Sequence, residues 1–89
     1  MASFAHIDLS DVDFTPELLR CIPAATVRMY RVLPVYEMPN CLGIVLADPS
    51  KVDVIDELFF ILGRELEIQQ ADQRQIDTFI ERLYGDEDQ

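Results

Sequence analysis

The residues best suited to metal binding or catalysis are the acidic residues of "LADPSKVDVIDELFF", residues 46–60. Asp48, Asp53, Asp56 and Glu57 lie close together in this stretch. Carboxylates at such density can bind Ca²⁺ or work as a paired acid and base. The other interpretation is that they cap and solvate a helix that begins in the same stretch.

The spacing of these acids does not match a calcium loop. An EF-hand needs Gly at position 6 and Glu at position 12 of its loop. Counted from Asp48, these positions hold Asp53 and Phe59, and a count from Asp8 fails in the same way. A carboxylate pair would also need a cleft, and acids on a helix surface of a small domain offer little room for one.

Other forms of catalysis lack their essential residues. His6 is the sole histidine, and nothing in the sequence ties it to a Ser or to Cys21 or Cys41, which are expected to be small core residues. The three glycines are spaced about twenty residues apart, so no glycine-rich phosphate loop exists. The sequence therefore predicts a chain that is not an enzyme and that has no cofactor and no metal.

The charge of the chain restricts its partners. Seventeen acidic side chains stand against seven basic ones, for a net charge of −10. Such a charge repels nucleic acid and anionic lipid, and it favours a protein partner with a basic surface. Solubility alone is the competing explanation for the acidic composition.

No segment resembles a signal peptide or a membrane span. "MASFAHIDLS" lacks a basic start and a long apolar core, and the longest apolar run, residues 41–47, is too short to cross a bilayer. Two cysteines without a secretion signal suit a reducing cytoplasm. We expect a cytoplasmic protein that does not insert into the membrane.

The first half of the chain predicts an arm, two short helices and a hairpin. Residues 1–14 form the arm, and a helix begins at Thr15 with Pro16 in its first position, before Pro23 interrupts it and a second helix follows. Residues 31–38 and 41–47 are strands joined by a turn. Pro34 places the first strand at an edge, and the second strand is apolar on both faces and therefore central.

The second half predicts a helix, a strand and a final helix. The helix starts near Ser50, with Ser50 and Asp53 as a capping box, and it ends at Gly63. Residues 65–69 alternate as a strand with Leu66 and Ile68 pointing inward. Asp72 and Gln75 form a second capping box for a helix that ends at Gly85, and residues 86–89 are an acidic tail.

Together these elements predict one α+β domain, residues 15–85, in the order ααββαβα. The sheet is mixed and three-stranded, with helices packed on it. Its hairpin is antiparallel, and the connection through the middle helix is a right-handed parallel crossover.

An ordered set of short motifs resembles a known family. The set is Ile22-Pro23, Tyr30-Arg31-Val32-Leu33-Pro34, Ala47-Asp48-Pro49, Asp56-Glu57-Leu58 and Gly63. Over residues 8–85 the chain resembles the N-terminal domain of the type II secretion and type IV pilus assembly ATPases. The resemblance implies a non-catalytic module that docks a motor to its inner-membrane platform or regulates it, with any ATPase activity in a separate domain.

Two alternatives to docking stay open. Some relatives in this family bind cyclic di-GMP through a tandem motif that starts with Arg-Leu-Gly, and this chain lacks that motif. A sensor of a cyclic dinucleotide or another nucleotide is still one alternative, with Arg28 and Arg31 as candidate phosphate ligands or, more simply, surface ion-pair partners. A free-standing adaptor of the same fold is the other.

The candidate partner site lies on the helix after Ser50. Its periodicity places Val52, Ile55, Leu58, Phe59 and Leu62 on one apolar face, and Asp53, Asp56 and Glu57 away from it. Phe60 falls among the acids, and the family often has a basic residue at Phe59. We therefore predict an exposed aromatic anchor ringed by Asp53, Asp56 and Glu57, unless both phenylalanines pack under the loop after Gly63.

Overall fold

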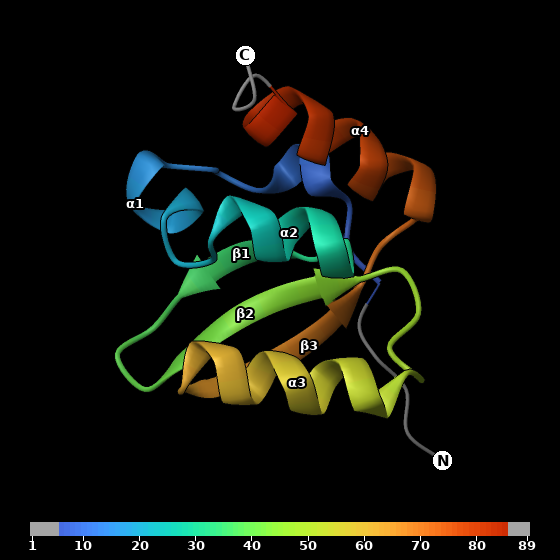
Figure 1. Cartoon of the computed structure of the whole chain (residues 1–89). Helices are drawn as coiled ribbons and strands as arrows, with labels where there is room; N and C mark the ends of the chain where they lie inside the picture. The colour runs from blue at the N-terminus through green and yellow to red at the C-terminus, as the bar shows by residue number, and fades with distance from the viewer. Residues whose placement is uncertain (1–5, 86–89) are drawn as a thin grey trace.

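The fold was obtained as a computed structural model that describes residues 6–85. Figure 1 shows its elements, which are η1 (Leu9–Asp11), α1 (Pro16–Leu19), α2 (Ala24–Tyr30), β1 (Leu33–Glu37), β2 (Cys41–Leu46), α3 (Val52–Leu62), β3 (Glu65–Gln70) and α4 (Gln73–Tyr84). The predicted α+β class and the order ααββαβα are confirmed. The tail at 86–89 and the first five residues of the predicted arm lie outside the described residues.

The sheet has the order β1-β2-β3. β1 runs antiparallel to β2, with a register shift between Pro34 and Tyr36, and β2 runs parallel to β3 over six residues without a shift. The predicted hairpin, the parallel crossover and the edge position of Pro34 are all confirmed. β2 is central because it is apolar on both faces, and Leu42, Ile44 and Val45 are fully buried.

The two faces of the sheet differ in polarity. Register places Ile44 and Ile68 on one face, whereas Gly43 shares the other face with Tyr36 and Glu67. In Figure 1, α2 and α3 lie in front of the sheet, with α3 over β3. Leu58 of α3 is fully buried, as its packing on the apolar face of the sheet requires.

The described part of the arm is attached at two points. Ile7 donates its backbone N–H to the carbonyl of Gln70 at 2.8 Å, and Leu9 is fully buried in the core. Leu9 also donates its N–H to the side-chain oxygen of Gln75 on α4 at 2.9 Å. The arm therefore joins the end of β3 to the start of α4.

Local signals at the first helices act as expected. The Thr15 hydroxyl accepts the N–H of Leu18 at 3.2 Å, and Pro16 occupies the first turn of α1. Pro23 separates α1 from α2. Gly63 ends α3 in the left-handed region at φ 66°, where its N–H donates to the Phe59 carbonyl.

Both predicted capping boxes are wrong. α3 begins at Val52, with Lys51 as its N-cap, because the Ser50 hydroxyl donates to Asp48 in a local turn instead of capping the helix. At α4 the N-cap is Asp72, as expected, but its side chain makes no capping bond. Gln75 binds the N-terminal arm instead of Asp72.

The predicted buried face of α3 is also wrong in part. Leu58 is the one fully buried residue of this helix, while Val52 is 64% exposed and Phe59 is 50% exposed. A single helix lying over an edge strand contacts the sheet along a narrow line, so the flank of the predicted apolar face stays in solvent. For the same reason Leu66 and Ile68 of the edge strand β3 are only half-buried.

Candidate protein-docking site

The five predicted site residues all lie on α3 and all are exposed. Phe60 is 86% exposed and Phe59 is 50% exposed, so the alternative in which both pack under the loop after Gly63 is excluded. Asp53, Asp56 and Glu57 are exposed as well. Large aromatic side chains held in solvent on a regular helix are a typical feature of binding surfaces.

Helical geometry divides these residues among three sides of α3. Each residue advances by about 100° around the axis. Asp53, Asp56 and Phe60 have the spacing i, i+3, i+7, so they form one stripe on the side opposite the buried Leu58. Phe59 lies on one flank of the helix and Glu57 on the other.

The flank of Glu57 faces α2. The Tyr30 hydroxyl donates a hydrogen bond to the Glu57 carboxylate, which joins the two helices. This bond is the main cause that raises the pKa of Tyr30 above its ordinary value. Glu57 is thus turned toward α2, and the structure does not bring it into the stripe with Phe60.

The flank of Phe59 faces away from α2, on the side of α3 where Val52 also lies. Val52 was not predicted as a site residue, and neither was Ile61, which is 44% exposed and lies on the opposite flank beside Glu57. The signal that could have found them is that eight of the eleven residues of VDVIDELFFIL are apolar, more than one narrow contact with the sheet can bury. We call Val52, Asp53, Asp56, Phe59 and Phe60 the α3 surface.

The α3 surface is acidic and lacks ion pairs within the described chain. The ion pairs found among residues 6–85 join Arg31 to Asp77 and Arg64 to Glu37, and neither involves an acid of α3. Arg64, which follows the helix, also donates to the carbonyl of Met38 at 3.0 Å. The carboxylates of α3 are therefore available to basic groups of another molecule.

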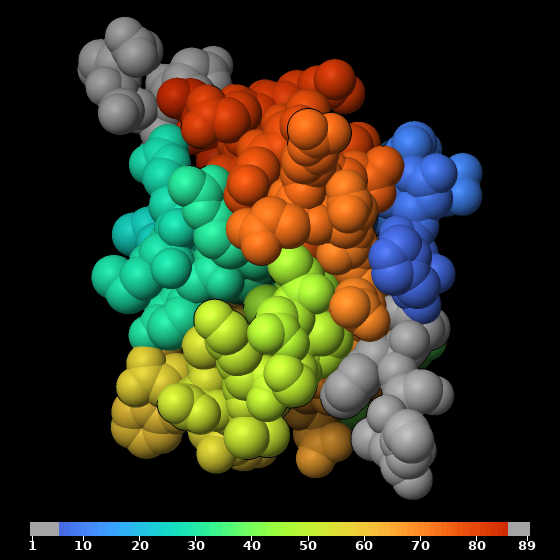
Figure 2. Space-filling view, turned by 90° about the vertical axis from the view of Figure 1, so that its right-hand side faces the viewer, coloured from blue at the N-terminus to red at the C-terminus, as the bar shows by residue number. Residues whose placement is uncertain are grey.

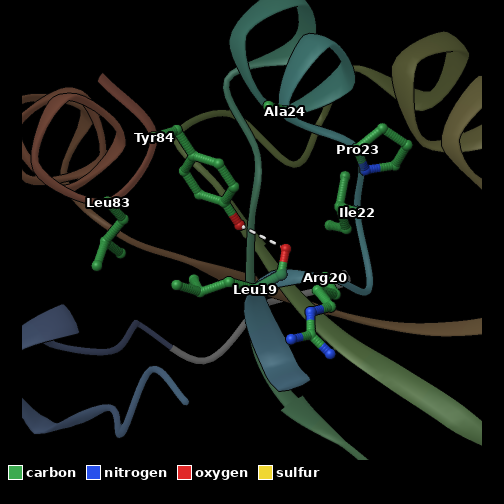
Figure 3. A pocket seen from close by; sticks show the side chains of 7 residues that line it. All are labelled: Leu19, Arg20, Ile22, Pro23, Ala24, Leu83 and Tyr84. Atoms are coloured by element: carbon green, nitrogen blue, oxygen red, sulfur yellow. Dashed lines mark hydrogen bonds between the residues drawn. The ribbon is translucent and has the colours of Figure 1, made fainter. Parts of the chain in front are cut away.

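Two of the surface cavities offer alternative sites. The larger, of 690 Å³, lies between α1, α2 and the end of α4, and Figure 3 shows its lining. There the Tyr84 hydroxyl donates to the Leu19 carbonyl at 3.2 Å, and the side chains that surround it are mostly apolar. No nucleophile lies beside a base in this cavity.

The smaller cavity, of 270 Å³, is lined by residues of α2, the segment 47–51 and the start of α4. Figure 2 shows the face on which these three segments meet. Arg31 and Lys51 line it, but so does Asp48, and Arg31 lies 3.6 Å from Asp77. It is a polar hollow without a set of convergent catalytic groups.

The candidate phosphate ligands have structural partners. Arg28 donates to the Tyr84 carbonyl and so ties α2 to α4, and Arg31 pairs with Asp77 on α4. Both cysteines are free and half-buried. Within residues 6–85 no group of three His, Cys, Asp or Glu side chains could hold a metal ion, and none of the helices there is long and apolar enough to span a membrane.

The sequence profile of the MshEN domain matches residues 2–89. The chain belongs to the MshEN domain family. Its resemblance to the N-terminal domain of type II secretion and type IV pilus assembly ATPases is thereby confirmed. This MshEN domain is 30% identical over 80 residues, 90% of the chain, to the type IV pilus assembly ATPase PilB of Myxococcus xanthus.

Solved structures of relatives share the fold of this MshEN domain. A structure of MshE with cyclic di-GMP superposes with a TM-score of 0.82 at 23% identity, covering 91% of this chain and 59% of that one. The N-terminal domain of XpsE superposes with a TM-score of 0.74 at 22% identity, covering 91% and 57%. The chain spans only 14% of the length of PilB.

Proposed function

We propose that this MshEN domain is a non-catalytic docking module of a secretion or pilus ATPase. It connects the motor to a protein of the inner-membrane platform, on the cytoplasmic side, without entering the membrane and without binding nucleic acid. The observation that carries the proposal is the α3 surface, where Phe60, 86% exposed, lies in one stripe with Asp53 and Asp56. Any ATPase activity resides in other domains.

The chemistry of the α3 surface defines the partner. Burying its apolar side chains against a partner is favourable by roughly 25 cal/mol per Å² of apolar area. Its carboxylates have no ion-pair partner among residues 6–85, so a basic groove supplies the missing charges and steers the encounter. An apolar groove lined with Lys or Arg fits both properties.

The test is the affinity of the domain for purified cytoplasmic domains of the platform proteins of the same cell. Phe60→Asp is expected to weaken binding by at least about tenfold, because it replaces a central anchor with a charge. Met29→Asp is the matched control, since Met29 is 72% exposed on α2 and lies outside the α3 surface. Equal affinity of the folded Phe60→Asp variant and the wild type would reject the proposed surface.

A cyclic-dinucleotide sensor is the second candidate function. It is favoured by the similarity to MshE, which was solved with cyclic di-GMP. Against it, Arg28 and Arg31 already engage Tyr84 and Asp77. Calorimetry with cyclic di-GMP and with ATP tests the idea, and the absence of binding heat for both would remove it.

A further inference from the structure

The outer edge of β3 has backbone groups that point away from the sheet. Ala71, just after β3, donates its N–H inward to Leu46 at 3.2 Å, whereas the Gln70 carbonyl accepts outward from Ile7 at 2.8 Å. Because neighbouring residues of a strand direct their backbone groups to opposite sides, the N–H and C=O groups of Leu66 and Ile68 also point outward. Among residues 6–85, His6 and Ile7 pair with Gln70 at the end of this edge, and no described residue pairs with the outward groups of Leu66 or Ile68.

The two edges of the sheet are protected differently. At β1 the edge contains Pro34 and a bulge before Tyr36, both of which interfere with pairing to a further strand. β3 has neither a proline nor a bulge, and its register with β2 is regular from Glu65 to Gln70. An edge strand of this regularity is a template for strand addition.

An apolar flank borders the free edge. Leu66 and Ile68 are half-buried on the face that α3 covers. α3 lies over β3 in Figure 1, and its Phe59 flank points away from α2, which places Phe59 on the side of the free edge. A strand added here would place alternate side chains against Leu66, Ile68 and Phe59. Its other side chains would lie beside the exposed Glu65 and Glu67.

We propose that the outer edge of β3 accepts a strand of the partner protein in which apolar residues alternate with Lys or Arg. The inference rests on the proposed docking function and specifies how the partner binds. Apolar side chains cover Leu66 and Ile68, and basic side chains pair with Glu65 and Glu67. The backbone of Leu66 and Ile68 supplies the hydrogen bonds.

The first test is an NMR titration of the chain with the peptide Lys-Val-Lys-Val-Lys-Val-Lys. The amides of Leu66 and Ile68 are expected to shift and to become protected from hydrogen exchange. Glu65→Lys reverses a charge at an exposed position, and it is expected to lower the affinity of the domain for the peptide by about threefold. Shifts that leave these two amides unchanged would overturn the proposal.

A proline pair tests the backbone geometry with the platform protein itself. Leu66→Pro removes an outward N–H, so the domain is expected to fold and to lose partner binding by at least about tenfold. Glu67→Pro removes an N–H directed at β2 and is expected to unfold the domain. Wild-type affinity in the folded Leu66→Pro variant would overturn the proposal for the β3 edge. If Phe60→Asp loses binding in the same assay, the docking function is still supported.

Two other occupants of the edge are distinguishable in the free chain. Protection of the Leu66 and Ile68 amides without any partner, lost when residues 1–5 are deleted, would assign the edge to the chain itself. Protection that rises with protein concentration would assign it to a second copy. Either result contradicts the proposal.

Discussion

Tyr36 and Gly43 form a cross-strand pair that depends on the absence of a side chain. A Cβ atom added to Gly43 would lie 2.4 Å from ring atoms of Tyr36. The ring crosses β2 at this point, so that the hydroxyl donates to Glu67 of β3 and accepts from Gln69 at 3.2 Å. One aromatic side chain therefore connects all three strands.

Gly43→Ala is expected to destabilise the domain by about 1–3 kcal/mol, since the rigid ring must move to make room for the methyl group. Urea unfolding measures the difference. Gly85→Ala is the control, because Gly85 has ordinary right-handed dihedrals and an added Cβ would meet only Glu81, at an ordinary contact distance of 3.5 Å, so alanine there changes stability by less than about 1 kcal/mol. Equal stability of Gly43→Ala and wild type would contradict the packing described.

The Tyr36 hydroxyl makes stability dependent on alkaline pH. Its hydrogen bond to Glu67, with a smaller effect of burial, raises the pKa of Tyr36 to about 12 from its ordinary value of 10.0. The unfolded chain thus releases this proton first, so the stabilisation is complete below pH 10 and is lost as pH rises to about 12. Burial raises the pKa of Tyr84 to about 12 as well, so the contribution of Tyr84 to stability is lost over the same pH range.

Tyr36→Phe is expected to make the loss of stability with rising pH less steep. Urea midpoints at pH 8, 10 and 11 should fall less steeply for the variant than for the wild type, with the remaining slope due to Tyr84. Tyr84→Phe provides the complementary comparison. Parallel curves for wild type and Tyr36→Phe would show that the bond to Glu67 does not form.

At the scale of elements, α3 carries both a residue that stabilises the core and the residues of the proposed docking surface. Leu58→Ala is expected to cost about 2–5 kcal/mol, since Leu58 is fully buried. Phe60→Ala is expected to change the free energy of unfolding by less than about 0.5 kcal/mol, because its ring is already in water. Chemical denaturation tests both, and a loss above 1 kcal/mol in Phe60→Ala would show that the ring packs on the domain.

The elements were predictable from sequence where their signals are local. Thr15 and Pro16 start α1, Pro23 separates two helices, and Gly63 ends α3 as expected. The capping boxes failed because Ser50 and Gln75 found other partners, and the partner of Gln75 is far away in the sequence. Periodicity alone could not show how narrow the contact of α3 with the sheet is, since that depends on β3 being the edge strand.

The exposure of the five candidate residues was predictable, but their arrangement was not. Phe59, Phe60 and the three acids are exposed, yet Glu57 is turned toward α2 by Tyr30, which lies on another element. Val52 and Ile61 were missed because a helical wheel with one apolar face assumes that the face is covered. The motif set identified the family, while the edge position of β3 became clear only from the strand order.

At the scale of the whole molecule, the net charge of −10 is expected to make the proposed docking sensitive to salt. The association rate with a basic platform domain is expected to fall by about tenfold or more between 50 and 500 mM NaCl, because exposed charges are screened over shorter distances. The dissociation rate, set by the apolar contacts of Phe59 and Phe60, should change much less. Surface plasmon resonance separates the two rates, and a salt-independent association rate would contradict a basic partner.

The most direct measurement of the central claim is site-specific photo-crosslinking in cells that carry the protein at its full length. A photoreactive residue replaces Phe60 on the α3 surface or, as a matched position, the exposed Thr78 on α4. The account predicts a crosslink to a platform protein from position 60 and none from position 78. Crosslinks from position 78 alone would contradict it.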